Sequence, residues 1–256
     1  MTMIDLNADM GEYRNEQERT REDALMQEIS SCSIACGGHI GDEQSMRYTI
    51  RSAQGNGVHI GAHPSYPDRD GFGRVSLEMD TSLLEMALKD QLIAIRNICA
   101  QENVALSHVK PHGALYNDAA RNENLALMIA ALVKQIIPGA ALFGLPSSYL
   151  EKAAHAKNIP FVAEGFIDRL YDHDGSLTPR SRQGAVIEEE DKRIAQAISL
   201  ARGDAITAAD GSQISLQIQT LCIHSDSDGS DKTAKALRSA FENANIQIRP
   251  PLHEQR

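Results

Sequence analysis

Short apolar runs typical of β-strands alternate with longer amphipathic stretches along most of this chain, and this alternation constrains its fold most strongly. The expected strands are Met3–Leu6, Ser31–Ala35, Val58–Gly61, Leu106–Val109, Ala140–Gly144, Phe161–Ala163 and Ile214–Ile223. The expected helices are Glu43–Gln54, Ser82–Glu102, Glu123–Ile137, Ser147–Lys157, Glu188–Ala201 and Lys232–Asn243. Strand–helix alternation without a run of hairpins predicts an α/β protein with a mainly parallel sheet.

Two architectures fit this alternation: a closed (β/α) barrel with seven or eight strands, or an open, doubly wound sheet. A cluster of ionisable residues follows nearly every expected strand. In a barrel all carboxyl ends of the strands surround one mouth, whereas an open sheet gathers its site near one switch point. The clusters therefore favour a barrel. Without a linker or repeat, we predict a single domain over residues 1–256, to which the final IQIRPP adds a last short strand.

The composition argues against several classes of partner. A formal net charge of −10 disfavours nucleic acid or an anionic membrane as the main partner. No apolar stretch approaches the roughly 20 residues that cross a bilayer. The chain enters MIDL almost at once, so we expect no signal peptide. The four cysteines lie in apolar runs, which predicts buried free thiols and a cytoplasmic location; a homo-oligomer stays open.

The first cluster, DLNADMGE, places Asp5, Asn7 and Asp9 on one face of a strand, followed by Glu12. In a barrel that face is the interior. A carboxylate there is a candidate general base, and a cap for nearby backbone amides is the alternative. We assign Asp9 a catalytic role and place Asn7 and Glu12 among the substrate-binding residues.

The cluster HVKPHGALYND contains the strongest candidate pair, Lys110 and His112, to which we assign catalytic roles, together with Tyr116 as a substrate-binding candidate. A lysine at a barrel mouth is costly to bury unless a partner or an anionic substrate satisfies it. We expect the charge of Lys110 to lower the pKa of His112, which suits a neutral base or ligand. His108, earlier on the same strand, is expected to be a hydrogen-bonded core residue.

Further candidates follow the other strands. His63 and Arg74 come from GAHPSYPDRDGFGR, where glycines allow close approach to an anion and arginine binds carboxylate or phosphate. We assign His63 a catalytic role. The remaining substrate-binding candidates are His39, Asp42, Glu164, Asp168, Arg169, His224 and Asp226. Asp42 is equally a natural helix cap.

A resident metal is not the leading interpretation, although it stays open. Several histidines and Asp9 could supply ligands to a divalent ion, but no local signature such as HExxH is present. The phosphate-binding sequence GxxxxGK[ST] does not occur either.

Taken together, DLNADMGE, IACGGHIGD, GAHPSYPDRDGFGR, HVKPHGALYND, FIDRLY and CIHSD resemble the motifs of the LamB/YcsF family in content and order. The resemblance runs from Asp5 to Asp226. It implies an irregular seven-stranded (β/α) barrel of the glycoside hydrolase/deacetylase type.

The resemblance also implies an activity, because family members form the A subunit of a prokaryotic 5-oxoprolinase. That activity is the ATP-dependent opening of 5-oxoproline (pyroglutamate) to L-glutamate with companion B and C subunits. ATP, with magnesium, would be a co-substrate bound by this chain or by its partners. Two alternatives stay open: a metal-dependent amidohydrolase or deacetylase of a small substrate, and a non-catalytic ligand-binding subunit.

Overall fold

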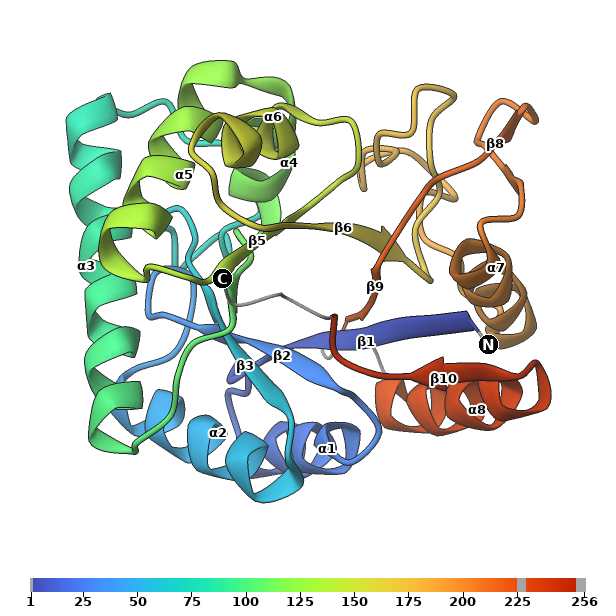
Figure 1. The fold of residues 1–256 in the computed structure, drawn as a ribbon, viewed down its shortest axis with the longest axis horizontal. Coiled ribbons are helices and arrows are strands. Elements are labelled where there is room, and N and C mark those ends of the chain that lie inside the picture. Colours follow the sequence, from blue (N-terminus) through green and yellow to red (C-terminus); the bar gives the residue numbers. More distant parts are fainter. Residues whose placement is uncertain (1, 225–228, 252–256) are drawn as a thin grey trace.

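Seven parallel strands close into a barrel at the centre of the molecule (Figure 1). The computed structural model describes residues 2–224 and 229–251. The barrel strands are β1 (Thr2–Met10), β2 (Ser31–Ala35), β3 (His59–His63), β4 (His108–Val109), β5 (Ala141–Gly144), β6 (Phe161–Phe166) and β9 (Thr220–Ile223). They pair in this order, and β9 returns to pair with β1. The predicted irregular seven-stranded barrel is confirmed.

Strand β1 makes the barrel irregular, because it is much longer than the others and has three partners. Its first residues pair with β10 (Ile246–Ile248), which lies outside the closed ring as the expected last strand. Its middle pairs with β9, and its end from Asn7 onward pairs with β2. The sequence predicted a strand only over Met3–Leu6. The strand continues to Met10 because Asn7 and Asp9 face a polar interior, not solvent.

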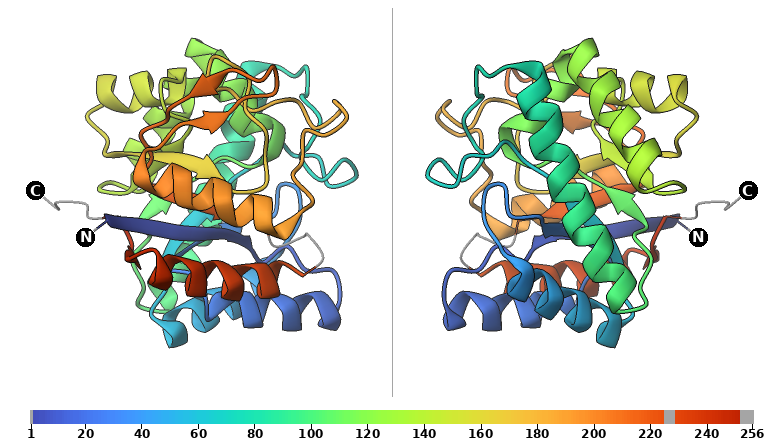
Figure 2. Two further views of the ribbon diagram at one scale, coloured as in Figure 1. Left: turned by 90° about the vertical axis from the view of Figure 1, so that its right-hand side faces the viewer. Right: turned by 90° about the vertical axis from the view of Figure 1, so that its left-hand side faces the viewer.

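Helices surround the barrel on its outer side (Figure 2). They are α1 (Glu16–Met26), α2 (Glu43–Asn56), α3 (Thr81–Gln101), α4 (Gly113–Arg121), α5 (Glu123–Ile136), α6 (Tyr149–Ala156), α7 (Glu190–Arg202) and α8 (Ser230–Asn243). Helix α3 buries Leu84, Leu88 and Ile95, as its periodicity predicted. Asp80 caps this helix by accepting a hydrogen bond from the amide of Ser82 at 2.8 Å.

Besides β1, two helices and the strands between α7 and α8 differ from the sequence-based expectation. Helix α1 was missed because most of its surface is polar; only Glu22, Leu25 and Met26 are buried. Helix α4 was missed because it is short and begins inside a motif interpreted as a loop. The single strand expected over Ile214–Ile223 is wrong: β8 (Gln213–Ile214) pairs antiparallel with β7 (Ile206–Thr207), and β9 starts only at Thr220.

The barrel interior is polar around Asp5, which is 1% exposed. The hydroxyl groups of Ser30, Ser31 and Thr220 donate to its carboxylate at 2.6, 2.8 and 2.5 Å. Burial nevertheless raises the pKa of Asp5 to about 6. The same Thr220 hydroxyl accepts from the side-chain amide of Asn7 at 2.7 Å, which links Asp5 to the next interior residue of β1.

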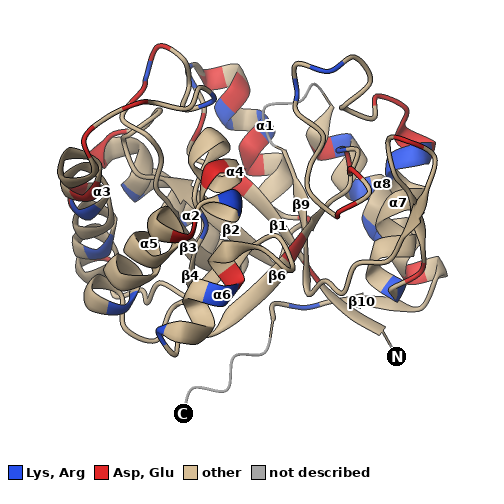
Figure 3. Cartoon of the chain, turned by 90° about the horizontal axis from the view of Figure 1, so that it is seen from above, with Lys and Arg blue, Asp and Glu red and all other residues tan. Residues whose placement is uncertain are grey.

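Charged side chains lie mainly on the helices and loops, where both signs are interspersed (Figure 3). The four cysteines are buried and free, as predicted. Among the described residues, no helix combines the length and apolar character needed to span a membrane.

Candidate active site

A cavity of about 330 Å³ opens where the barrel strands end. It is lined by Asp9 near the end of β1 and Glu12 just after it, by the segments that follow β3, β4, β6 and β9, and by helix α4. The predicted site residues that line it are Asp9, Glu12, His63, Arg74, Lys110, His112, Tyr116, Arg169 and His224. Residues more than 200 positions apart in the sequence therefore meet at one mouth, as the strand-end clusters predicted.

Lys110 lies at the base of this cavity and is only 2% exposed. Its ammonium nitrogen is 2.6 Å from Asp9 Oδ1 and 3.0 Å from Glu164 Oε1. It also donates to Asn7 Oδ1 at 3.0 Å and contacts Cys222 Sγ at 3.2 Å. Burial alone would lower the pKa of Lys110, but the neighbouring carboxylates outweigh it and hold that pKa well above its ordinary value. The lysine is therefore a fixed, buried positive charge.

Asn7 and Glu164 were expected to contact substrate, but neither lines the cavity, and both are 0% exposed. The side-chain amide of Asn7 donates to Glu164 Oε1 at 3.0 Å, and both residues contact Lys110 from within the barrel. Burial and the charge of Glu164 hold the pKa of Tyr116 well above its ordinary value. The structure places Asn7 and Glu164 as supports for Lys110.

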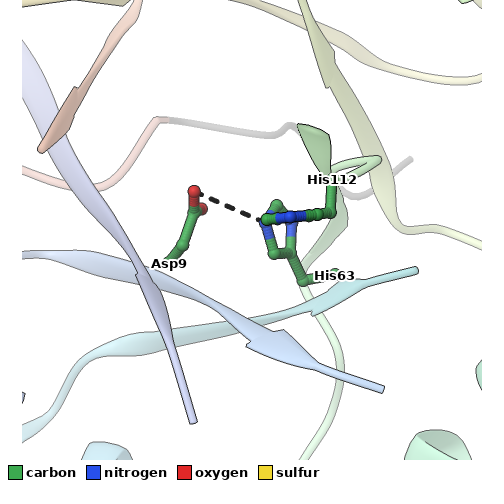
Figure 4. Close-up of side chains that lie close together, drawn as sticks. All are labelled: Asp9, His63 and His112. Atoms are coloured by element: carbon green, nitrogen blue, oxygen red, sulfur yellow. Dashed lines mark hydrogen bonds and ion pairs between the residues drawn. The ribbon is translucent and has the colours of Figure 1, made fainter. Parts of the chain in front are cut away.

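Three histidines and two carboxylates form a cluster beside Lys110. His112 Nδ1 is 3.0 Å from His63 Nε2 and 3.3 Å from Glu12 Oε1. His63 Nε2 is 3.4 Å from Asp9 Oδ2, and Figure 4 shows these side chains converging from β1, β3 and the segment before α4. His39 does not line the cavity; its ring stacks on His112 at 3.7 Å, and its Nε2 is 2.8 Å from Glu12 Oε1.

The predicted lowering of the His112 pKa by Lys110 is wrong. Burial does disfavour the charged ring, but the carboxylates of Glu12 and Asp9 outweigh it and raise the pKa of His112. His39 behaves in the opposite way, because burial lowers its pKa to about 4 despite the hydrogen bond to Glu12. Of these two stacked rings, His112 therefore binds a proton more readily than His39.

The turn after β1 fixes Glu12 through Glu22, a residue that the sequence did not mark. Glu22 lies on α1 and accepts hydrogen bonds from the amides of Gly11 and Glu12 at 2.7 and 2.9 Å. Burial raises the pKa of Glu22 to about 8. The sequence could not identify Glu22 as a site residue because helix α1, which carries it, was not predicted from its mostly polar sequence.

The loop after β3 positions two of the histidines. The backbone carbonyl of Phe72 accepts a hydrogen bond from His112 Nε2 at 2.9 Å, with Phe72 in the left-handed conformation at φ 55°. A Cβ on Gly73 would lie 2.9 Å from the His112 ring and 3.0 Å from His39 Cβ, so only glycine fits there. Arg74 is exposed at the rim, with its guanidinium 5.0 Å from the centre of the Phe72 ring.

The loop after β6 and the end of β9 contribute the opposite wall. His224 Nδ1 is 2.8 Å from Asp168 Oδ2, and Asp168 itself does not line the cavity. Although burial would raise the pKa of Asp168, the charge of His224 lowers it. Arg169 lines the cavity and donates to the carbonyl of Thr178 at 2.6 Å; burial and the charge of Arg180 lower its pKa to about 10.

Asp42 was also predicted to be a site residue, but it lies away from the cavity. Asp42 is an exposed helix cap, and its carboxylate accepts from the Ser45 amide at 2.8 Å in a capping box at the start of α2. Asp226 lies outside the described residues. The sequence also missed Cys222, which strand alternation places on the same face as His224, and Arg180 at the rim.

The fold and the site define a parallel β/α barrel with an ionisable cavity at the carboxyl ends of its strands, the position at which enzymes of this architecture carry their active sites. The chain belongs to the LamB/YcsF family, whose family model matches residues 4–256.

Two relatives and one solved structure are similar to this chain over nearly their full lengths. The chain is 41% identical over 251 residues to the A subunit of 5-oxoprolinase from Chloroflexus aggregans, a match that covers 98% of this chain and 100% of that protein. It is 39% identical over 248 residues to the A subunit of 5-oxoprolinase from Haemophilus influenzae, covering 97% and 99% of the two chains. A crystal structure of a lactam utilization protein from Thermus thermophilus superposes with a TM-score of 0.87 at 33% identity, covering 96% and 99%.

Proposed function

We propose that this protein is the A subunit of a 5-oxoprolinase and takes part in the ATP-dependent hydrolysis of 5-oxoproline to L-glutamate. The names of its near-full-length relatives support a role in opening a lactam. The observation that carries the proposal is the cavity, whose lining brings Lys110 together with His63, His112, Asp9 and Glu12 and also contains arginines.

The cavity suits a small anion in size and charge. Its volume of about 330 Å³ lies at the lower end of the range typical of small-molecule sites, roughly 300–1,000 Å³. Arg74, Arg169 and Arg180 line it, and a guanidinium binds a carboxylate through two parallel hydrogen bonds. We assign these arginines to the substrate carboxylate.

The groups at the base of the cavity match the chemistry of amide cleavage. Lys110 is a preorganised positive charge that would stabilise negative charge developing on the carbonyl or phosphate oxygen. Asp9 or His63 would accept the proton of the attacking water. His112, whose pKa is raised, would donate a proton to the departing ring nitrogen.

Coupling to ATP follows from the poor electrophilicity of an amide. Transfer of the γ-phosphoryl group to the lactam oxygen gives ADP and an activated carbon. Water then attacks that carbon and the carbon–nitrogen bond breaks, which gives a free amine and an acyl phosphate. A second water hydrolyses the acyl phosphate to the glutamate carboxylate and inorganic phosphate. The chain has no GxxxxGK[ST] sequence, so we assign ATP and magnesium mainly to companion B and C subunits.

Reconstitution with the companion subunits tests this proposal. Asp9→Asn and Lys110→Met should each abolish release of glutamate from 5-oxoproline and ATP, whereas the exposed His173→Ala should retain activity. Circular dichroism checks that each variant is folded. Full activity in either site variant contradicts the assigned role. A change in substrate affinity alone would instead identify a protein that binds ligand without catalysing the reaction.

A further inference from the structure

Exposed apolar side chains are concentrated in one short segment, which comprises the end of the loop before α3 and the first turns of that helix. Among the described residues, five large apolar or aromatic side chains are exposed, and three of them belong to this segment. Val75 is 58% exposed, Leu83 54% and Met86 58%. Single exposed apolar residues need no explanation, whereas a concentration of them marks an interaction site. We call these three side chains the apolar rim.

The apolar rim borders the cavity. Arg74 and Ser76, the neighbours of Val75 in the sequence, both line the cavity. Helix α3 begins shortly after Ser76 and runs along the outer side of the barrel (Figure 1). Leu83 and Met86 lie in its first turns, three positions apart, and therefore share one face of the helix. A protein that covers the apolar rim would thus lie beside the opening of the cavity.

The segment that carries the apolar rim is fixed by contacts on its inner side. Ser76 Oγ donates to Asp118 Oδ1 at 3.0 Å, and the hydroxyl of Tyr66 donates to Oδ2 of the same carboxylate at 2.9 Å. Leu77 and Met79 pack against the core. The exposed side chains are therefore presented by a preformed surface, which loses little conformational freedom when a partner binds.

Acidic side chains surround the apolar rim. Between residues 70 and 90, the exposed acidic residues are Asp70, Glu78, Asp80, Glu85 and Asp90, and the exposed basic residues are Arg74 and Lys89. A partner that fits this surface is apolar at its centre and bordered by lysine or arginine, because opposite charges steer association and like charges oppose it. A second copy of this chain, paired through the same surface, would present a second acidic border. The charges therefore favour a different protein as the partner.

We propose that the apolar rim binds the companion B and C subunits through an apolar surface bordered by basic residues. This inference rests on the proposed function, in which the companion subunits bind ATP and this chain holds the lactam. Phosphoryl transfer requires the γ-phosphate and the lactam oxygen to meet. The companion subunits must then lie against the opening of the cavity, where the apolar rim is found.

Binding of the purified companion subunits to the full-length chain tests the proposal. In calorimetry, the double variant Leu83→Glu/Met86→Glu should bind them at least tenfold more weakly, because it places charges in an apolar interface. Glu85→Lys should also weaken binding, since it opposes a basic border. Met3→Glu is the matched control and should keep native affinity, because Met3 is 52% exposed at the start of β1, away from the cavity. Circular dichroism checks that each variant is folded.

Turnover separates an interface from a catalytic role. At saturating companion subunits the double variant should regain the native turnover number, because neither Leu83 nor Met86 lines the cavity. Native affinity in the double variant would overturn the proposal, as would a native chain that does not bind the companion subunits. Loss of self-association with unchanged companion binding would also overturn it, by identifying a second copy of this chain as the occupant.

The binding measurement needs neither 5-oxoproline nor ATP, so the two proposals can fail separately. Association that the double variant weakens, without turnover in the native complex, would contradict only the proposed function. Turnover by a complex whose affinity the double variant leaves unchanged would contradict only the assignment of the apolar rim.

Discussion

Replacement of Lys110 by methionine should destabilise the fold as well as stop the reaction. Methionine has a similar length and fills the same space, so the main loss is the positive charge. The change leaves Asp9 Oδ1 and Glu164 Oε1 buried without the ammonium that lies 2.6 and 3.0 Å from them. An uncompensated buried charge is one of the most damaging consequences of a single substitution.

The magnitude follows from these distances. Unit charges at 2.6–3.0 Å attract by about 6 kcal/mol for an effective dielectric constant of about 20. Much of that attraction offsets the cost of removing the lysine from water, so the loss on breaking a buried pair is about 3–5 kcal/mol. With a urea dependence of roughly 2–3 kcal/mol per molar, the unfolding midpoint should fall by about 1.5 M.

Urea denaturation followed by circular dichroism measures this change. Glu164→Gln removes one of the stranded carboxylates, so the double variant Lys110→Met/Glu164→Gln should be more stable than the sum of the single effects by roughly 0.5–3 kcal/mol. Equal midpoints for the native chain and Lys110→Met, or strictly additive effects, would refute the view that Lys110 neutralises buried carboxylates.

Three further predictions follow from the structure. The pKa of Asp5 is about 6 when folded and 3.8 otherwise, so the free energy of unfolding should fall as pH rises from about 4 to 6. Urea titrations at several pH values should show a flatter slope for Asp5→Asn; an unchanged slope excludes Asp5 as the cause. Gly73→Ala should cost about 1–3 kcal/mol and reduce turnover, whereas Gly139→Ala, also left-handed but with open space around it, should cost less in thermal unfolding and leave turnover unchanged. Burial raises the thiol pKa values, that of Cys36 to about 12, so the native chain should react with a thiol reagent only after unfolding; rapid labelling of the native chain would contradict this.

The barrel and the location of its site could be predicted from the sequence, because parallel strands place their carboxyl ends around one mouth. Strand alternation correctly placed Asn7 and Asp9 on the interior face. It did not give depth along the barrel axis, so it did not distinguish Asp9 at the cavity from Asn7 beneath Lys110. That distinction depends on register between strands far apart in the chain.

The spacing of residues along the sequence also could not predict which charged side chains surround each ionisable group. The pKa of His112 depends on Glu12, which reaches it through a turn held by α1. The sequence showed Lys110 as the nearest charge to His112, whereas the fold adds two carboxylates. Asp42 fitted a cap and a site equally well, and only its position at the start of α2 decides between them.

The hydrogen bonds that Thr220 makes with Asp5 and Asn7 cross the junction between β1 and β9, where the barrel closes, and Asn7 in turn accepts a hydrogen bond from Lys110. The lysine is thereby set in place by the last pairing that turns a sheet into a ring. A folding intermediate in which β1 and β9 are not yet paired would keep much of its secondary structure, but Lys110 would not be held at the base of the cavity. Ring closure and the acquisition of activity should then coincide during refolding, so activity would report the completed barrel.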